Sequence, residues 1–506
     1  MVLKVCMFVH NNFKHDSRVL KEAKTLAEVG YDVRVIAVLD ETTEPYEERD
    51  GFRIIRVPKN PLHYRLLRVM KPLKCNIPSK LIARMKQPFR EIDEEITDKG
   101  IAGYVREAIR TCPIIFFTLG WIRLLVYYMY RCARGVFPRR IRRSAKVIYK
   151  YTKEALYWVI CRPARQLRSF FYNRLKWFLM FFHKPLSFFD YYYCTLQLVK
   201  KEPADIYHAH DLNTLPAACL AKRKTGGKLV YDSHELYVEI NRSKKQSRFA
   251  KFLLSKTEFL LIKSADHVIT VSDSIGEELK RRYPIKRLTV ILNAPSCRTV
   301  RHGLSLRDEL KIPEFNKIII YVGNITINRG LEELIQSIVY LNHCVVVIMG
   351  RASNFAYSQK LKQLARDVAV ENKVYYFGPV PFEDVTKYAA SADVGVAPIK
   401  NACLSYYYCL PNKLFEYIAG GLPTVVSNFP ELKRVIKEYN LGRTFNPDDP
   451  KDIAEAINYV LSDKDKYEEM KRNALQAAKV FNWENESKKL LEIYKKLGDE
   501  LSITSN

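Results

Sequence analysis

The stretch that most constrains the fold is residues 401–430, NACLSYYYCLPNKLFEYIAGGLPTVVSNFP. A loop ends at LPN, residues 410–412, and the residues after it have the pattern of a helix that stops at the two glycines 420–421. Proline just before a helix and glycine just after it are the usual boundaries. Pro423 then opens a short apolar run that is typical of a buried strand. The stretch therefore predicts a loop, a helix and a strand of one α/β unit.

The start of this helix is a candidate phosphate site. A helix N-terminus presents unpaired backbone N–H groups and the positive end of the helix dipole, which together favour phosphate. Lys413 adds a full positive charge there, and Glu416, one turn later, is placed to accept hydrogen bonds from a ribose. Phosphate and ribose together predict a nucleotide. The alternative is an ordinary α/β unit on which both residues are solvated surface charges.

The sequence NKLFEYIAGGLPTVVS resembles the nucleotide-sugar helix of retaining glycosyltransferases of family 4. This family has the GT-B fold, an α/β architecture of two Rossmann-like parallel-sheet domains that face a cleft. Many members carry a pair of glutamates here, but this chain keeps only the second, Glu416, and has Tyr408 at the first position. A variant with aromatic residues before LPNKLFEY also occurs in the family, so we interpret Tyr408 as the mark of a subgroup. The resemblance implies donor contacts from Asn412, Lys413, Leu414 and Glu416.

The N-terminal segment predicts a β-α-β unit. Residues 2–9 form an apolar run, Asp16 and Ser17 can cap the helix that follows, and residues 31–38 form the next strand. Such a unit implies a parallel sheet, whose ligands bind beyond the carboxyl ends of the strands. We therefore assign Asn12 and Asp16 to the acceptor side, with a plain helix cap as the alternative for Asp16. There is no GxGxxG motif, and VHNNFKHDSR stands where family 4 has a glycine-rich turn.

Histidines and carboxylates follow two later predicted strands, in HAHD (208–211) and DSHE (232–235). Residue types of this kind can bind a metal. Family 4 enzymes hold the diphosphate with positive side chains and a helix end, so we expect no metal and no cofactor besides the donor. The resemblance assigns His234 to a catalytic position facing donor and acceptor, with a structural histidine as the alternative. We expect Asp211 and Glu235 to orient acceptor hydroxyls and His210 to lie on the acceptor side.

The second domain begins with KIIIYVGN, a predicted buried strand that leads into the turn at residues 323–330. In family 4 this turn usually carries an arginine and a lysine that hold the diphosphate. Here Asn324 and Arg329 take these places, so one charge is missing. A guanidinium can still pair with two phosphate oxygens at once. We expect Gly323, Asn324 and Arg329 to contact the donor, and the alternative for Arg329 is a surface position.

Residues 62–200 interrupt the α/β pattern and contain 28 Lys and Arg against 8 Asp and Glu, so they hold 20 of the 28 net positive charges. They also hold 26 of the 61 aromatic residues. Basic residues interleaved with Trp, Tyr and Phe are typical of a membrane interface. The apolar run 113–130 is barely long enough to span a bilayer and contains Arg123, so we favour helices lying on an anionic membrane surface. The alternatives are a packed helical subdomain and a nucleic-acid-binding segment, although no nucleic-acid module is recognisable.

The remaining features fix the expected organisation and location. The eleven cysteines form no C-x-x-C pair, which indicates free thiols in a reducing compartment, and the N-terminus predicts a strand rather than a signal peptide. We expect a cytoplasmic enzyme, peripheral on the inner face of the cell membrane, with a nucleotide-sugar donor and a lipid-linked saccharide acceptor. A soluble acceptor and an inactive homologue acting as a membrane-bound partner are the alternatives. The predicted domains are 1–61 with 201–296, the insertion 62–200, 297–480, and a final helix 481–506 that returns to the first domain.

Overall fold

The computed structural model describes residues 2–58, 62–70, 162–241, 246–296, 304–352 and 354–504. The chain divides into two compact units, Met1–Lys59 with Tyr191–Asn506, and Asn60–Asp190. The run 113–130, for which a membrane position was considered, lies outside the described residues. None of the helices within the described ranges combines the length and the apolar content needed to cross a bilayer.

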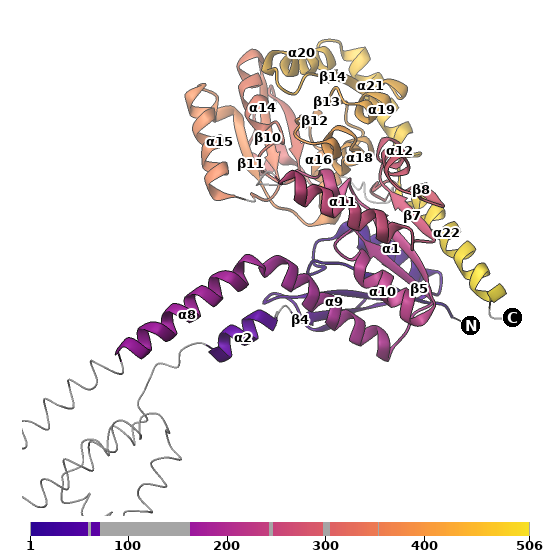
Figure 1. Ribbon diagram of the computed structural model, residues 1–506. Coiled ribbons are helices and arrows are strands. Elements are labelled where there is room, and N and C mark those ends of the chain that lie inside the picture. The colour runs from indigo at the N-terminus through magenta and orange to yellow at the C-terminus, as the bar shows by residue number, and fades with distance from the viewer. Residues whose placement is uncertain are drawn as a thin grey trace, which may run out of the picture. The chain divides into compact units, whose positions relative to one another are not determined.

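The larger unit holds two sheets, and the first has eight strands in the order β3-β4-β2-β1-β5-β6-β7-β8 (Figure 1). All neighbours pair in parallel except β3, which pairs antiparallel with β4. The sequence analysis missed β3, although Asp50 and Gly51, both with positive φ, form the Asp-Gly turn that is typical of a hairpin. The strands are β1 (Lys4–Phe8), β2 (Asp32–Leu39), β3 (Tyr46–Arg49), β4 (Phe52–Pro58), β5 (Ile206–His210), β6 (Lys228–Ser233), β7 (His267–Thr270) and β8 (Leu288–Val290).

The second sheet has six strands in the order β11-β10-β9-β12-β13-β14, all parallel. The two strands predicted in this domain, in KIIIYVGN and after Pro423, are confirmed. Two sheets of parallel strands with helices between them are the α/β architecture that the resemblance implied. The strands are β9 (Lys317–Val322), β10 (Cys344–Met349), β11 (Val374–Phe377), β12 (Val394–Ala397), β13 (Thr424–Ser427) and β14 (Gly442–Phe445).

Helices connect the parallel strands, and three short 3-10 turns, η3 (Tyr237–Glu239), η5 (Ile338–Tyr340) and η6 (Glu371–Lys373), complete the connections within the described residues of this unit. Those that accompany the first sheet are α1 (Ser17–Glu28), α9 (His183–Lys201), α10 (Leu215–Thr225), α11 (Arg248–Ile262) and α12 (Asp273–Arg282). Those of the second are α13 (Leu306–Leu310), α14 (Leu331–Ser337), α15 (Phe355–Asp367), α16 (Phe382–Ala390), α17 (Leu404–Tyr407), α18 (Asn412–Ala419), α19 (Pro430–Glu438), α20 (Pro450–Leu461) and α21 (Lys464–Ala478).

The first sheet is buried on both faces. Successive residues of a strand point to opposite faces, and in β1 Val5 and Met7 join one core cluster while Cys6 and Phe8 join the other. A continuous apolar strand is what such double burial requires.

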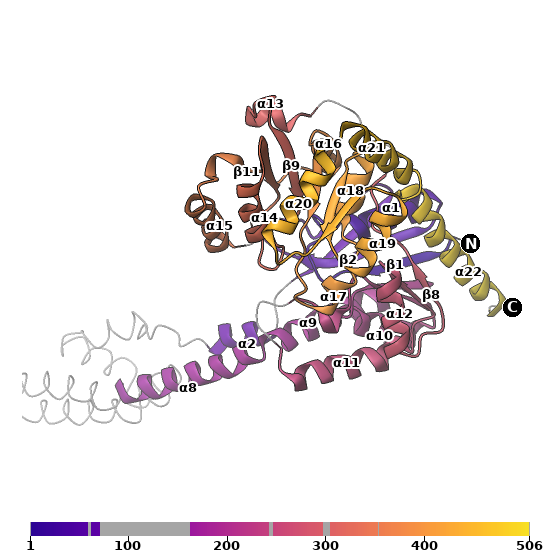
Figure 2. The same cartoon turned by 90° about the horizontal axis from the view of Figure 1, so that it is seen from above.

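The last helix, α22 (Trp483–Thr504), packs on the first sheet (Figure 2). Its residues Leu490 and Tyr494 belong to the same core cluster as Val5 of β1. The indole N–H of Trp483 donates to Thr25 Oγ1 of α1 at 2.9 Å. The C-terminal segment therefore lies against the first domain of the chain.

The second segment of the larger unit begins at Tyr191, before the end of the insertion that was expected at residue 200. Tyr191 and Val199, in the second half of α9, are buried in the core of the first sheet, and Tyr191 Oη donates to Val9 O at 3.1 Å. Apolar residues that the sequence assigned to the insertion therefore complete the core of the sheet.

The described part of the smaller unit consists of α2 (Leu62–Met70), α8 (Arg162–Phe181) and the start of α9. His63 Nε2 lies 2.8 Å from His183 Nδ1. Several aromatic side chains of α8 are exposed, among them Phe171, Trp177 and Phe181, the last by 72%. Exposed aromatic residues at this density are unusual for a helix that faces water alone.

Candidate active site

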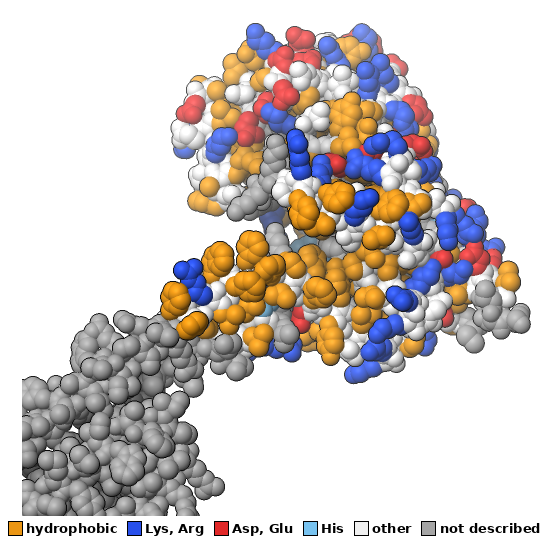
Figure 3. Space-filling model, viewed as in Figure 1, with side chains coloured by type: hydrophobic (Ala, Val, Ile, Leu, Met, Phe, Trp, Pro, Cys, Tyr) orange, Lys and Arg blue, Asp and Glu red, His pale blue; other side chains and the backbone are white. Residues whose placement is uncertain are grey.

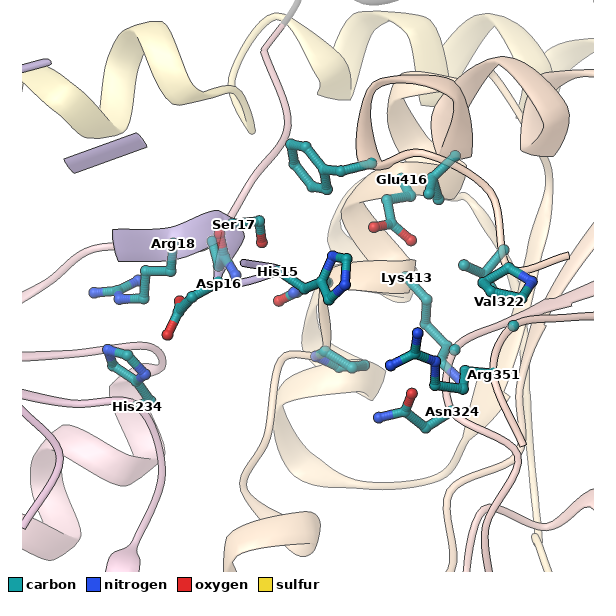
Figure 4. Close-up of a pocket in the computed structure, with 18 of the residues that line it drawn as sticks. His15, Asp16, Ser17, Arg18, His234, Val322, Asn324, Arg351, Lys413 and Glu416 are labelled. Atoms are coloured by element: carbon teal, nitrogen blue, oxygen red, sulfur yellow. The ribbon is translucent and has the colours of Figure 1, made fainter. Parts of the chain in front are cut away.

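A cavity of about 1250 Å³ lies within the larger unit, where the carboxyl ends of strands from both sheets come together. Its first-domain wall comes from the turn after β1, the start of α1 and residues 234–235 after β6. Its second-domain wall comes from the turns after β9 and β10 and from the start of α18. Figure 4 shows side chains of the two walls facing each other across the cavity.

The start of α18 brings Lys413 into the second-domain wall. Its ammonium is buried and has no hydrogen-bond partner among the described residues, and it lies 3.5 Å from the centre of the Tyr321 ring. Burial, with a contribution from the nearby Arg329, holds the pKa of Lys413 well below its usual value. Gly323 has a φ of +135°, and a Cβ there would come within 3.4 Å of the Lys413 ammonium. The positive φ therefore favours glycine at this position beside the lysine.

Arg329 lies in the same wall, in the turn after β9. Its guanidinium stacks 4.6 Å from the centre of the Tyr406 ring, and its Nε has no hydrogen-bond partner within the described part of the chain. Gly330 fixes the turn, because its φ is +66° and a Cβ there would meet Pro398 O at 1.8 Å. The wall thus holds two cationic side chains that are supported by aromatic rings rather than by carboxylates.

Tyr408 does not line the cavity. Its side chain packs against the core of the first domain, and its backbone carbonyl accepts a hydrogen bond from Ser272 Oγ at 2.8 Å. The aromatic residue that faces the cavity from this segment is Tyr406. The position that usually carries the first glutamate therefore supports a contact between the domains.

Glu416, Asn412, Gly323 and Asn324 all line the cavity, whereas Leu414 does not. The backbone N–H of Leu414 already donates to Pro411 O at 3.0 Å, and its side chain is completely buried. Burial raises the pKa of Glu416 to about 7, although Lys413 and Lys21 oppose the shift. Glu416 therefore changes charge close to neutral pH.

The first-domain wall rests on a buried pair of charges, Arg18 and Asp232. Arg18 Nε and Nη2 donate to the two carboxylate oxygens of Asp232 at 2.8 and 2.9 Å, and Nη1 donates to Ile291 O at 2.9 Å. Burial would raise the pKa of Asp232, but the guanidinium of Arg18 together with His234 and His210 outweighs it and holds this pKa well below its usual range. Such a bidentate pair fixes both side chains.

His234 lies at the edge of the cavity and contacts Asp232 of this pair. Its Nε2 lies 3.0 Å from Asp232 Oδ2, and its Nδ1 lies 3.6 Å from Asp211 Oδ2. Burial alone would lower the pKa of His234, but the carboxylates of Asp211 and Asp232 raise it to about 10. At neutral pH the side chain is therefore an imidazolium that faces the cavity.

His210 and Asp211 lie behind His234 and are not among the residues that line the cavity. His210 Nδ1 is 3.2 Å from His234 Nε2, and Asp211 accepts a hydrogen bond from the His234 backbone N–H. Neither residue is therefore placed to make the direct contact with an acceptor that was expected from the sequence. They act on the cavity through His234, which each of them contacts.

The other first-domain residues of the predicted site do line the cavity. Asn12 Nδ2 donates to Asp40 Oδ2 at 2.7 Å. Asp16 caps α1 by accepting from Val19 N and also accepts from Asn11 Nδ2 at 2.8 Å. Its capping role is therefore confirmed, and it borders the cavity as well. Glu235 lines the same wall.

Four residues whose side chains can bind a metal come together below this wall: Glu22, His208, His210 and Asp232, with one ligand atom of each within 4.8 Å of the others. Arg18 already contacts both carboxylates, since its Nε lies 3.2 Å from Glu22 Oε1 and 2.8 Å from Asp232 Oδ2. A cation of the protein itself therefore occupies the position between the acidic groups.

Several residues of the site were missed from the sequence. Arg18 and Glu22 lie one turn apart on the buried face of α1, beside Val19 and Ala23. Charged residues on an otherwise apolar face were the available sign of a buried ion pair. His15, which Figure 4 shows between Asp16 and Lys413, and Arg351, which it shows beside Lys413 and Asn324, gave no such sign, since both lie in irregular turns.

Two protein-family models match consecutive parts of the chain. The model described as Glycosyltransferase Family 4 matches residues 157–295, and the model described as Glycosyl transferases group 1 matches residues 305–477. The first match ends after β8, and the second covers all six strands of the second sheet. The first match therefore covers β5 to β8 of the first sheet, and the second covers the whole second sheet.

Curated relatives carry names of the same kind. An uncharacterized glycosyltransferase of Methanocaldococcus jannaschii is 28% identical over 303 residues, which cover 58% of this chain and 75% of that protein. A D-inositol 3-phosphate glycosyltransferase of Corynebacterium urealyticum is 25% identical over 252 residues, which cover 47% of this chain and 58% of that protein. The matches thus span between 58% and 75% of the length of these two relatives.

Solved structures share the fold at low identity. Sucrose-phosphate synthase from Thermosynechococcus elongatus gives a TM-score of 0.65 at 15% identity, covering 98% of this chain and all of that one. Anabaena HepE in complex with UDP and glucose gives 0.59 at 14% identity, with coverage of 98% and 100%. WaaG, a glycosyltransferase involved in lipopolysaccharide biosynthesis, gives 0.56 at 14% identity, with coverage of 97% and 99%.

The two parallel sheets and the two family matches define the chain as a glycosyltransferase with the GT-B fold. Within that class, it is similar to the group 1 and family 4 enzymes.

Proposed function

We propose that the chain transfers a sugar from a nucleotide-sugar donor whose diphosphate binds between Lys413, Arg329 and the start of α18. The observation that carries the proposal is the buried Lys413 ammonium, which lines the cavity without a hydrogen-bond partner among the described residues. A buried cation without an acceptor is costly unless an anion completes it. The free N–H groups at the start of α18 favour the same anion. Glu416 would accept hydrogen bonds from the ribose.

The electrostatic arrangement suits departure of a diphosphate. As the bond between the sugar and the diphosphate breaks, negative charge grows on the leaving phosphate, and fixed cations stabilise it most when water is excluded. Lys413 and Arg329 would supply this stabilisation from the second-domain wall. The imidazolium of His234 faces the cavity from the other wall, so it would contribute positive charge rather than act as a base at neutral pH. Retention of configuration is what the resemblance to family 4 implies, and no metal would be needed.

The proposed acceptor is a saccharide linked to a lipid, at the inner face of the cell membrane, in the synthesis of a surface polysaccharide or another glycan. The exposed aromatic side chains of α8, such as Trp177 and Phe181, support a membrane-associated enzyme. The basic composition of residues 62–200 favours an anionic bilayer surface. The similarity to WaaG supports the same kind of pathway.

A donor screen tests this function. The full chain, kept in mild detergent, would be heated with UDP-, GDP- and other nucleotide sugars, and we expect one nucleotide class to raise the melting temperature. The same donor should then be turned over with a lipid-linked acceptor in the presence of excess chelator. Stabilisation by no nucleotide sugar would contradict the donor site. Activity lost in chelator and restored by magnesium would contradict the metal-free diphosphate site, and equal turnover with water-soluble sugars would contradict the lipid-linked acceptor.

A further inference from the structure

Helix α11, which follows β6 and η3 in the larger unit, presents an apolar face to solvent. Phe249, Phe252, Leu253 and Leu260 are exposed by 70%, 56%, 48% and 65%. Their spacing places them on one side of the helix. Large exposed apolar side chains gathered on one element mark an interaction surface more often than single ones do.

The orientation of this face is fixed by contacts on the opposite side of the helix. Glu258 is buried, and its two carboxylate oxygens accept hydrogen bonds from Tyr231 Oη at 2.7 Å and Tyr283 Oη at 2.8 Å. Ile262 belongs to the core of the first sheet. The apolar side chains therefore cannot turn inward without breaking buried hydrogen bonds, so their exposure is a stable feature of the fold.

The charges around this face have one sign. Lys256 and Lys263 are exposed beside the apolar residues, and both stack on Phe259, at 5.7 and 4.3 Å from the ring centre. Arg248 is exposed at the start of the helix, and the only acidic residue of α11 is the buried Glu258. In Figure 3 basic and apolar side chains lie together over this helix. Long basic side chains that cover apolar surface and carry their charge outward are suited to a lipid headgroup layer.

We propose that α11 lies flat on an anionic bilayer and inserts Phe249, Phe252, Leu253 and Leu260 among the lipids. At 15 residues the helix is about 22 Å long, and its four charged residues exclude a crossing. A second copy of the chain fits this face poorly, because two such faces would bring like charges together. The charges instead complement phospholipids with negative headgroups.

The position of α11 in the chain relates this surface to the cavity. β6 ends at Ser233, the next residues His234 and Glu235 line the first-domain wall, and η3 then leads toward α11. Contact of α11 with a bilayer would hold the acceptor side of the cavity close to membrane lipids. The surface itself stands on its own observations, and only this delivery of the acceptor rests on the proposed function.

Photo-crosslinking in the full chain separates α11 from the basic segment 62–200. A benzophenone amino acid replaces Phe252 in one variant and Phe315, exposed by 67% in the second domain, in the control. Both are mixed with phosphatidylcholine vesicles with and without phosphatidylglycerol. We expect lipid adducts from position 252 that increase at least tenfold with phosphatidylglycerol, and none from position 315. Absence of lipid adducts at 252 while the protein is bound to vesicles, or adducts to a second copy of the chain, would overturn the proposal.

A matched set of substitutions gives a second measurement. F252S, L253S and L260S together should weaken partition onto the same anionic vesicles in high salt at least tenfold. The control combines F315S, V339S and F355S, three exposed apolar residues of the second domain, and should leave partition unchanged. Donor binding of both variants in detergent is measured alongside, so a failure of the donor site is seen separately from a failure of the surface. Unchanged partition of the α11 variant would overturn the proposal.

Discussion

The two walls of the cavity differ in whether their buried basic side chains are paired with carboxylates. In the first-domain wall, Arg18 is neutralised by Asp232 through two hydrogen bonds, and His234 is held between Asp232 and Asp211. In the second-domain wall, Lys413 and Arg329 meet aromatic rings and have nitrogen atoms without an acceptor within the described residues.

This difference separates two tasks. A buried charge that is fully paired holds the structure in one arrangement, whereas a buried charge without a partner leaves a place for a ligand of opposite sign. The first wall therefore positions His234, and the second wall is prepared for an anion. Loss of charge should accordingly damage stability on one side and binding on the other.

The largest effect is expected from Asp232→Asn, which removes the bidentate counter-charge of the buried Arg18 guanidinium and leaves only Glu22, 3.2 Å from Arg18 Nε, as an acidic neighbour. Removal of one partner of a buried ion pair typically costs about 3–5 kcal/mol of unfolding free energy. Urea unfolding measures it. Asp273→Asn is the matched control, because Asp273 pairs with Arg434 at 3.0 Å with both side chains about half exposed, and its loss should cost less than about 1 kcal/mol. Equal losses in the two variants would remove the contrast between paired and unpaired walls.

The next effect concerns Lys413→Met, which keeps the length of the side chain and removes its charge. We expect the affinity for the nucleotide-sugar donor to fall by about ten- to a hundredfold, since a hydrogen bond to a charged group contributes about 1.5–3 kcal/mol. The unfolding free energy should not fall, because no bonded partner is lost. Lys433→Met, on the exposed side of α19, should change neither quantity. A Lys413→Met protein that is strongly destabilised but still binds donor would show that the lysine is structural.

A smaller effect is expected from pH. Burial raises the pKa of Glu416 to about 7, so its carboxylate is mostly protonated below neutral pH. If the ribose is held by the ionised form, donor affinity falls up to tenfold for each pH unit below the pKa. Glu416→Gln should bind more weakly at alkaline pH and lose this dependence. Titration calorimetry across the neutral range measures it, and a wild-type affinity that stays constant below pH 7 would place Glu416 outside the ribose contact.

The sequence predicted those parts of the site that depend on neighbours in the chain. Pro411 and Gly420 mark the two ends of the helix α18, and this helix and the strand after it are confirmed. Lys413 and Glu416, which the helix carries, line the cavity. Asp16 and His234 were also predicted from their neighbours in the chain, because they follow β1 and β6, and both line the cavity.

The sequence did not predict contacts between distant segments. Arg18 and Asp232 are 214 positions apart, and no local pattern links them. Whether Tyr406 or Tyr408 faces the cavity depends on which side of the short helix α17 faces the first domain, and this is set by packing between the domains. The end of the basic insertion was placed too late, because the aromatic residues of α9 resemble those of α8 although Tyr191 is buried in the core of the sheet.

The most direct test of the account is the number of protons taken up when the donor binds. Burial and Arg329 lower the pKa of Lys413 in the free protein, and a bound diphosphate should raise it again, so binding should draw protons from solution at pH values between these two pKa values. Calorimetry in buffers of different ionisation enthalpy measures this uptake. The account predicts uptake by the wild-type protein and its loss in Lys413→Met, while Lys433→Met behaves as wild type. Donor binding without proton uptake, or equal uptake by Lys413→Met, would contradict the claim that the second-domain wall holds an unpaired lysine whose positive charge the diphosphate stabilises.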